Sequence, residues 1–183
     1  MNIPNSLSLL RIALIPCFVV VFYLPVGWAR IAAAVLFTMA ALTDWLDGYL
    51  ARRLGQTSKL GAFLDPVADK LMVAVVLVIL LQSDPTIWLA LPVAIIIGRE
   101  ITVSALREWM AELGARTKVA VSFLGKVKTA AQMIAIVLLI LRGTVSILPV
   151  YEAGFILLYI ASALTLWSMF QYLLAAWPEL SRR

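Results

Sequence analysis

The stretches DWLDGYLAR (residues 44–52) and GAFLDPVAD (residues 61–69) lie eight residues apart and hold the features that decide the fold. They contain four of the ten acidic residues of the chain, and long apolar runs precede the first stretch and follow the second. Ionised carboxylates beside apolar spans are costly unless other groups compensate their charge. Because the connection between the stretches is short and polar, we expect two helices that form a hairpin and bring the carboxylates together.

The 183-residue chain is 63% hydrophobic, which is well above the apolar content of an ordinary soluble domain. Apolar runs recur at intervals close to the roughly 20 residues that a bilayer-spanning helix needs. The six predicted spans are Leu7–Leu24, Ala29–Leu50, Ala62–Gln82, Thr86–Leu106, Val119–Leu141 and Ile147–Ala175. We therefore expect an all-α polytopic membrane protein, with six transmembrane helices in a single domain over residues 1–183. An N-terminal interfacial segment is expected to turn inward at Pro16.

Lys and Arg residues gather at two of the connections between these spans, and this placement predicts the orientation of the chain. They flank the connection between the second and third spans and that between the fourth and fifth: Arg52, Arg53, Lys59, Lys70, Arg107, Arg116, Lys118, Lys126 and Lys128. The opposite side holds only Arg30 and Arg142. Both termini and both basic connections are therefore expected in the cytoplasm.

The chain has no histidine, and Cys17 is its only cysteine. These counts exclude histidine-ligated metals, serine–histidine hydrolase chemistry and an internal disulfide. Any general base must then be a carboxylate, Lys, Tyr or Cys. The formal charge of +5 in so apolar a chain favours contact with anionic lipid headgroups or phosphorylated substrates.

The four aspartates form two pairs with helical spacing. Asp44 and Asp47 are spaced i, i+3, whereas Asp65 and Asp69 are spaced i, i+4, so each pair lies on one face of its own helix. Four carboxylates that face one another repel strongly, and one or two divalent cations bound by their oxygens would relieve the repulsion. Hard oxygen ligands favour Mg²⁺ or Mn²⁺. The resulting neutral surface could bind a pyrophosphate.

Two other interpretations of the aspartates stay open. They could cap helices or pair with Arg52, Arg53 and Lys70 in a solvated loop, although four carboxylates at this spacing favour a common site. Intramembrane carboxylates also mark cation transporters. A transporter is disfavoured because these aspartates cluster at one membrane face and the sequence shows no inverted repeat.

Residues 44–69 resemble the signature of the CDP-alcohol phosphotransferase family, with four Asp, two Gly, one Ala and one Arg at the family spacing. The resemblance implies that the four aspartates bind metal and that Asp69 is also the catalytic base. It further implies that four residues of the motif bind CDP-diacylglycerol: Gly48, Ala51, Arg52 and Gly61. Small side chains let the nucleotide approach the helix backbone, and a guanidinium suits a phosphate oxygen. A homodimer is expected from the family alone.

A second polar region, residues 99–129, is basic where the first is acidic. Its cations include Arg99, Arg107, Lys118, Lys126 and Lys128. They could surround an anionic acceptor, because a phosphate monoester carries close to two negative charges at neutral pH. They could instead follow the positive-inside rule and contact lipid phosphates. Arg99 falls inside an apolar span beside Glu100, where it binds a ligand or forms a structural ion pair.

This basic region, with residues 2–5 (NIPN) and 165–169 (TLWSM), resembles the bacterial branch of the family whose acceptor is sn-glycerol 3-phosphate. The resemblance implies transfer of the phosphatidyl group from CDP-diacylglycerol to that acceptor, with release of CMP, at the cytoplasmic face of the bacterial inner membrane. It implies that Arg99, Arg107 and Lys126 bind the acceptor phosphate, and that Asn5, Ser8 and Arg11 lie near the nucleotide. Sibling enzymes that use inositol phosphate, serine or phosphatidylglycerol remain alternatives, and the basic region favours a phosphorylated acceptor.

Overall fold

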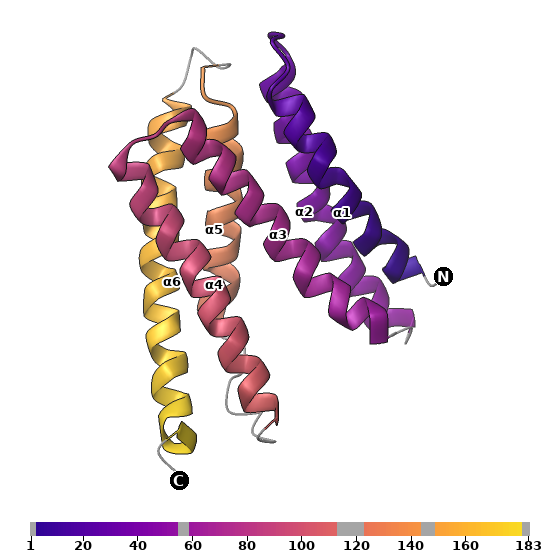
Figure 1. Ribbon diagram of the computed structural model, residues 1–183, viewed down its shortest axis with the longest axis vertical. Coiled ribbons are helices and arrows are strands. Elements are labelled where there is room, and N and C mark those ends of the chain that lie inside the picture. The colour runs from indigo at the N-terminus through magenta and orange to yellow at the C-terminus, as the bar shows by residue number, and fades with distance from the viewer. Residues whose placement is uncertain (1–2, 55–58, 113–122, 144–148, 181–183) are drawn as a thin grey trace.

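The computed structural model describes the backbone of residues 3–54, 59–112, 123–143 and 149–180, and the side chains of residues 9–43, 67–112, 127–143 and 149–177. The described ranges contain six α-helices and no β-strand (Figure 1). The helices are α1 (Ile3–Phe22), α2 (Ala29–Leu54), α3 (Lys59–Ser83), α4 (Ile87–Glu112), α5 (Phe123–Ile140) and α6 (Val150–Leu180). The predicted all-α fold is confirmed, and each predicted span corresponds to one helix.

The helices differ from the predicted spans mainly where charged residues follow an apolar run. α4, for example, continues to Glu112, because Arg and Glu are good helix formers even where they cannot lie in lipid. α1 runs as one helix through Pro16, so the interfacial segment predicted before Pro16 is part of α1 and no separate element. A proline removes one backbone hydrogen bond, and the bonds on either side of it can maintain the helix.

The helices form two groups (Figure 1), and side chains from both groups make one apolar core. α1 packs against α2 and α3, whereas α4 and α5 both pack against α6. Contacts of α3 with α4 and of α2 with α5 join the two groups. All six helices contribute fully buried side chains to the core, among them Phe18, Phe37, Leu77, Ile96, Ile136 and Leu158. This shared core holds the ends of the helices in fixed relation to one another.

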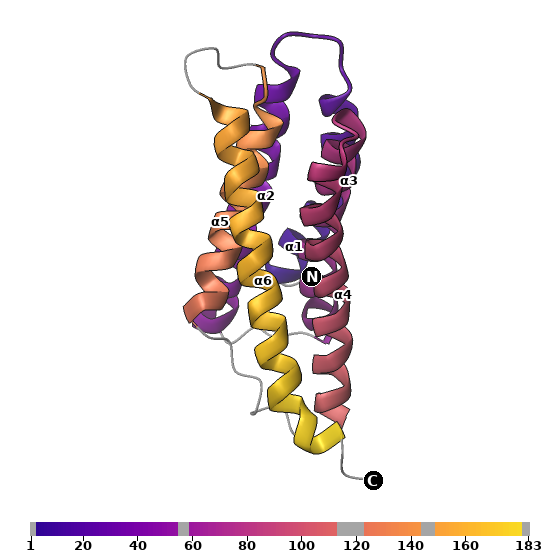
Figure 2. The ribbon, with the colours of Figure 1, turned by 90° about the vertical axis from the view of Figure 1, so that its left-hand side faces the viewer.

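The antiparallel helices give the molecule two chemically different ends. We call the end where α2 finishes and α3 begins the aspartate end, since it carries residues 44–69. The opposite end, where α3 finishes and α4 begins, is the far end. Both termini lie toward the aspartate end (Figures 1 and 2), as expected for an even number of spans. At the far end, Tyr23 donates a 2.6 Å hydrogen bond to Gln82 and so joins α1 to α3.

Gly154 allows α5 and α6 to pack closely. A Cβ atom at this position would come within 2.9 Å of Leu138 Cβ and 3.2 Å of the Ala135 carbonyl oxygen. Because that oxygen belongs to the backbone, a side chain at residue 154 would force the helices apart. Close approach through a small residue is typical of helix pairs in membranes.

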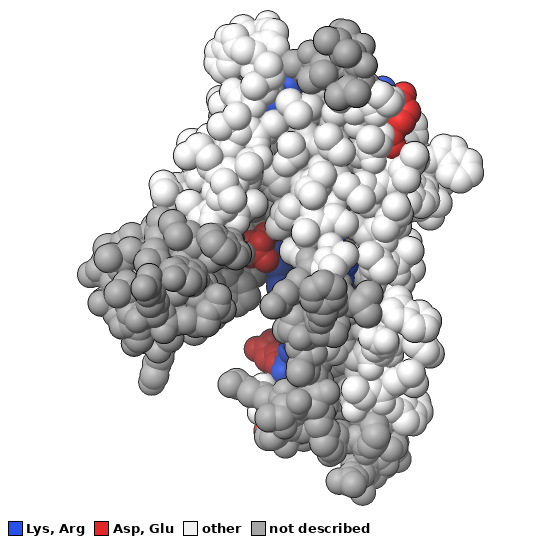
Figure 3. Space-filling model, turned by 180° about the vertical axis from the view of Figure 1, so that it is seen from behind, with Lys and Arg blue, Asp and Glu red and all other residues white. Residues whose placement is uncertain are grey.

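The outer surface fits a membrane environment. Among the residues that the structure describes, two helical segments are long and apolar enough to cross a bilayer by length and composition: Ile87–Glu112 and Val150–Trp177. Every helix exposes large apolar side chains, such as Val20, Ile31, Val78, Ile101, Ile134 and Ile156. Seen from behind, most of the described surface consists of residues other than Lys, Arg, Asp and Glu (Figure 3). The charged residues gather in a hollow and at the far end. So much exposed apolar surface indicates association with a membrane.

Candidate active site

The aspartate end is built by the hairpin of α2 and α3. Residues 55–58 alone separate the last residue of α2 from the first residue of α3. Asp44 and Asp69 each lie ten residues from these helix ends, whereas Asp47 and Asp65 lie seven and six residues from them. A helix rises about 1.5 Å per residue. The hairpin therefore places the four aspartates at two heights along the helix axes. Asp44 and Asp69 share one height, and Asp47 and Asp65 share the other, nearer the connection.

Asp69 is the one aspartate of this quartet whose side chain is described, and it lines a narrow cavity. It is half-buried and shares the cavity with Arg11 of α1, which is only 1% exposed. Phe37 and Ala40 of α2 and Met133 of α5 form part of the same lining. The structure thus brings the predicted base and one predicted nucleotide-site residue together, in apolar surroundings that strengthen their electrostatic interactions with a ligand.

The remaining predicted residues of the motif are carried by the same helices. Asn5 and Ser8 belong to α1, Asp44, Asp47, Gly48, Ala51 and Arg52 to α2, and Gly61 and Asp65 to α3. Lys126, predicted to bind the acceptor phosphate, belongs to α5. The side chains of all these residues lie outside the described part of the structure, so their roles stay predictions.

A groove of about 730 Å³ separates α3 from α4 beside Asp69. One part of its lining is apolar and includes Val67, Leu71, Ala74, Ile97 and Ile101. The other part is polar and consists of Lys70, Glu100, Ser104, Arg107 and Glu108. The groove therefore combines a surface suited to a hydrocarbon chain with charged groups suited to a headgroup.

Hydrogen bonds position the polar side chains of this groove. The Lys70 ammonium donates to Ser104 Oγ and so joins α3 to α4. Arg107 Nη2 donates a 3.0 Å hydrogen bond to Tyr172 Oη, and the guanidinium carbon lies 5.2 Å from the centroid of that ring. Tyr172 belongs to α6 and is 8% exposed. A buried tyrosine thus orients Arg107, whose other N–H groups remain available to an anion.

Arg99, Glu100 and Lys128 form a cluster in the interior beside the groove. Arg99 Nη1 lies 2.5 Å from Glu100 Oε1, so the structural ion pair considered from the sequence is formed. Lys128 of α5 is 6% exposed and lies within electrostatic range of Arg99, Glu100 and Arg107. Lys128 therefore lies near two other cations, Arg99 and Arg107, and one carboxylate, Glu100. Arg99 Nε is buried and donates to no described residue, which is uncommon unless a ligand or water accepts the bond.

The sequence places Lys128 among the cations of residues 99–129, but the resemblance assigns the acceptor phosphate to Lys126 and not to Lys128. A signal for Lys128 is nevertheless present in the sequence. Gln132, Ala135 and Ile136 follow it at helical spacings of four, seven and eight residues, and all of them are buried. This periodicity places Lys128 on the inward face of α5.

Residues 1–167 match the family model described as CDP-alcohol phosphatidyltransferase. The chain belongs to this family. Curated relatives named CDP-diacylglycerol--glycerol-3-phosphate 3-phosphatidyltransferase match almost the whole chain. The one from Yersinia enterocolitica is 56% identical over 180 residues, which are 98% of this chain and 97% of the relative. The one from Escherichia coli strain K12 is 55% identical over 179 residues, with the same two coverages. As a CDP-alcohol phosphatidyltransferase, the chain is a transferase of phospholipid biosynthesis.

The donor set of the hairpin fits the divalent cation that this family of phosphatidyltransferases implies. The motif offers carboxylate oxygens at two levels, and such donors suit Mg²⁺ or Mn²⁺. Among the described residues, no group of three or more His, Cys, Asp or Glu could hold a metal, and Asp69 alone of the quartet belongs to that part. Asp44, Asp47, Asp65 and Asp69 thus remain the ligands predicted for that cation from the sequence.

Proposed function

We propose that the protein transfers the phosphatidyl group of CDP-diacylglycerol to sn-glycerol 3-phosphate, giving phosphatidylglycerol phosphate and CMP. This is the activity of a phosphatidylglycerophosphate synthase. One observation carries the proposal: a four-aspartate hairpin lies within a chain that is matched over 98% of its length by relatives named for this transfer. Membership of the family also disfavours the cation transporter considered from the sequence.

The acidic residues of the aspartate end would prepare the donor. One or two Mg²⁺ or Mn²⁺ ions, when bound by the four aspartates, would supply positive charge to the pyrophosphate of CDP-diacylglycerol. Arg11 adds a buried positive charge beside Asp69. The nucleotide would lie against the small residues and the guanidinium of the motif, with α1 close by: Gly48, Ala51, Arg52, Gly61, Asn5 and Ser8.

Asp69 would act as the general base. It accepts the proton of the primary hydroxyl of the acceptor while that oxygen forms a bond to the β-phosphorus of the donor. The bond from this phosphorus to the bridging oxygen breaks, and CMP leaves with the bonding electrons. A position on α3 between the metal-binding motif and the α3–α4 groove supports this role for Asp69, because donor and acceptor must meet there.

The basic cluster would bind the phosphate of the acceptor. The groove and the adjoining cluster hold four cations, Lys70, Arg99, Arg107 and Lys128, and two acids, Glu100 and Glu108. The difference of about two charges matches a phosphate monoester, which is close to dianionic at neutral pH. Arg99 Nε, buried without a described acceptor, is a donor that such a phosphate could satisfy. Lys126 remains a further candidate on α5.

The apolar part of the α3–α4 groove supports binding of a lipid donor from the side. Its aliphatic side chains lie next to Lys70 and Asp69 along α3. An acyl chain of CDP-diacylglycerol could lie along this surface while its headgroup reaches the aspartate end. We propose that all six helices cross the bacterial cytoplasmic membrane, with the aspartate end at the cytoplasmic face and the protein assembled as a homodimer.

The acceptor is tested by supplying purified protein with CDP-diacylglycerol, Mg²⁺ and one labelled alcohol at a time. We expect label in the lipid phase from sn-glycerol 3-phosphate, with one CMP released for each lipid formed. Labelled serine, inositol phosphate and phosphatidylglycerol should remain unreacted, with no label in a new lipid product. Preferential labelling from any of these three would contradict the proposed acceptor while leaving the family chemistry intact.

A further inference from the structure

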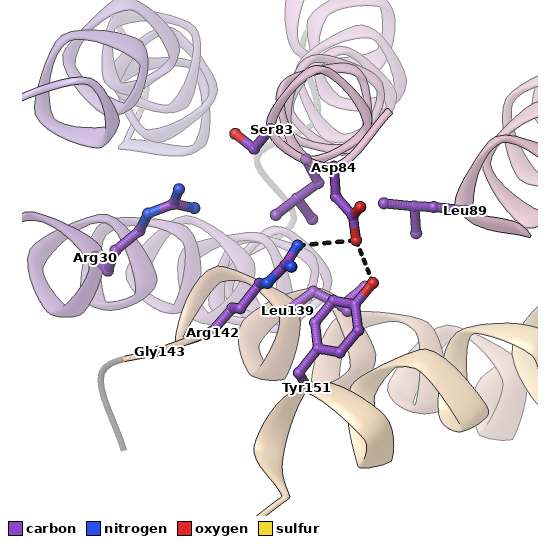
Figure 4. Close-up of a pocket in the computed structure, with 9 residues that line it drawn as sticks. Arg30, Ser83, Asp84, Leu89, Leu139, Arg142, Gly143 and Tyr151 are labelled. Atoms are coloured by element: carbon purple, nitrogen blue, oxygen red, sulfur yellow. Dashed lines mark hydrogen bonds and ion pairs between the residues drawn. The ribbon is translucent and has the colours of Figure 1, made fainter. Parts of the chain in front are cut away.

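The far end contains a cavity of about 250 Å³ that plays no part in the proposed reaction. It opens where the starts of α2, α4 and α6 meet the ends of α3 and α5. Its polar lining consists of Arg30, Ser83, Asp84, Arg142 and Tyr151 (Figure 4). Arg30 and Arg142 are the two cations that the sequence assigns to this side of the membrane, and the fold brings both to one cavity.

One of these arginines is neutralised by its neighbours. Arg142 Nη1 lies 2.8 Å from Asp84 Oδ2, and Tyr151 Oη donates a hydrogen bond to the same oxygen (Figure 4). The Arg142 guanidinium also lies 4.4 Å from the centroid of the Tyr151 ring. We call these contacts the Asp84 clamp. They pair the one carboxylate of the lining with Arg142 and Tyr151, so it is not available to neutralise Arg30.

Arg30 is left without an equivalent partner. Its guanidinium lies 4.0 Å from the centroid of the Phe22 ring, and no carboxylate among the described residues forms an ion pair with it. Figure 4 shows the guanidinium pointing toward the space beside Ser83 and Arg142. Glu152, a nearby acid, is exposed and does not line the cavity. The lining therefore holds two arginines and one aspartate.

We propose that this cavity binds a phosphate group, presented either by a phospholipid headgroup or as a free anion. Two guanidinium groups that face one cavity repel each other, and a bound anion removes that repulsion. Guanidinium is well matched to phosphate oxygens because its N–H groups form a planar fork. The excess of one positive charge equals the charge of a phosphodiester. The Ser83 hydroxyl can donate a further hydrogen bond at the edge of the cavity.

Binding can be measured on full-length protein in an uncharged detergent by isothermal titration. The Lys128→Gln background weakens phosphate binding at the proposed acceptor site, so that the far end dominates the signal. The titrants are short-chain phosphatidylglycerol, inorganic phosphate and a short-chain diacylglycerol without phosphate. Binding of the phospholipid alone identifies a headgroup site, binding of inorganic phosphate with equal affinity identifies a free-anion site, and both results support the proposal.

The substitutions Arg30→Gln and Ser83→Asp should each weaken binding at least tenfold, because one removes the unpaired cation and the other adds a competing negative charge. Arg182→Gln, which removes the same charge near the C-terminus, should leave the affinity unchanged. Turnover of Arg30→Gln in the otherwise native chain should equal that of the native protein. Absence of phosphate-dependent binding, equal binding of diacylglycerol, or native affinity in a folded Arg30→Gln or Ser83→Asp variant would overturn the proposal. These outcomes do not depend on transferase activity, so they are separate from a failure of the proposed function.

Discussion

The two ends of the helix bundle differ in how far their charges pair with one another. At the far end, the Asp84 clamp pairs acid with base near the ends of α3 and α5 and the start of α6, and it leaves Arg30 as the one excess charge of the cavity lining. At the aspartate end, the α2–α3 hairpin concentrates carboxylates, and the adjoining Lys128 lies near Arg99, Arg107 and Glu100. Charges that satisfy one another contribute to packing, whereas an excess of one sign requires a ligand to balance it. The excess of charge, and not the number of charged residues, marks the sites where ligands are expected.

The largest contrast is expected between Asp69, which lies within α3, and Asp84, which directly follows it. Asp69→Asn should lower turnover by a factor of about a thousand or more, because general-base catalysis alone contributes about 10²–10⁴-fold and a metal ligand is lost as well. Asp84→Asn should retain most of the activity, since the clamp is remote from the reaction. The measurement is conversion of labelled sn-glycerol 3-phosphate to lipid, with circular dichroism to establish folding. Near-native turnover of Asp69→Asn, or equal loss in both variants, would contradict the difference between the ends.

A smaller effect on acceptor binding is expected at Lys128. Lys128→Gln should raise KM for sn-glycerol 3-phosphate about ten- to a hundredfold, because a hydrogen bond to a charged group contributes about 1.5–3 kcal/mol. KM for CDP-diacylglycerol should stay near its native value. Arg142→Gln, which removes a cation at the far end, serves as the control and should change neither constant. If Lys126→Gln raises the acceptor KM and Lys128→Gln does not, then the phosphate is bound by the residue predicted from the sequence.

The Asp84 clamp should matter for stability although it does not matter for turnover. Its loss should destabilise the protein more than the loss of an exposed acid at the same end. Asp84→Asn should lower the free energy of unfolding by about 1 kcal/mol, a modest value because water screens an arginine that is 48% exposed. Glu152→Gln removes an exposed acid next to Tyr151 and should leave the melting temperature unchanged. Thermal unfolding in detergent compares the two variants. Equal melting temperatures for Asp84→Asn and the native protein would show that the clamp contributes no net stability.

The smallest effect concerns the orientation of Arg107. Tyr172→Phe removes the hydroxyl that accepts the 3.0 Å hydrogen bond from Arg107 but keeps the ring beneath the guanidinium. A hydrogen bond to a charged group contributes about 1.5–3 kcal/mol, but this bond acts on the acceptor only through the orientation of Arg107, so the acceptor KM should rise by about three- to fivefold with little change in kcat. Tyr151→Phe makes the same change at the far end and should leave KM unaltered. A similar KM for native protein and Tyr172→Phe would mean that Arg107 does not depend on this contact.

The fold was largely predictable because apolar runs in this chain are long and well separated. The six helices follow from those runs, and the aspartate hairpin follows from the i, i+3 and i, i+4 spacing on either side of a short connection. Helix ends were less predictable, since Arg and Glu extend α4 past the apolar residues that define a span. Pro16 did not divide α1, because one missing backbone hydrogen bond does not outweigh the packing on both sides.

Contacts between distant parts of the chain could not be predicted from spacing. The bond from Arg107 to Tyr172 joins α4 to α6, and the Asp84 clamp joins residues from three helix ends. Local periodicity says which face of a helix is buried, but not which neighbour covers it. Lys128 is the intermediate case, since its inward position was readable from the pattern of α5 whereas its proximity to Arg99 was not.

The central claim is that the carboxylates of the α2–α3 hairpin remain charged because divalent cations bind there and hold CDP-diacylglycerol. The most direct test follows CMP release by purified protein supplied with this donor and sn-glycerol 3-phosphate, before and after treatment with EDTA. We predict that chelation reduces CMP release to background and that added Mg²⁺ or Mn²⁺ restores it in the native protein but not in Asp69→Asn. Unchanged CMP release after chelation, or no consumption of donor by folded protein with either cation present, would contradict the claim.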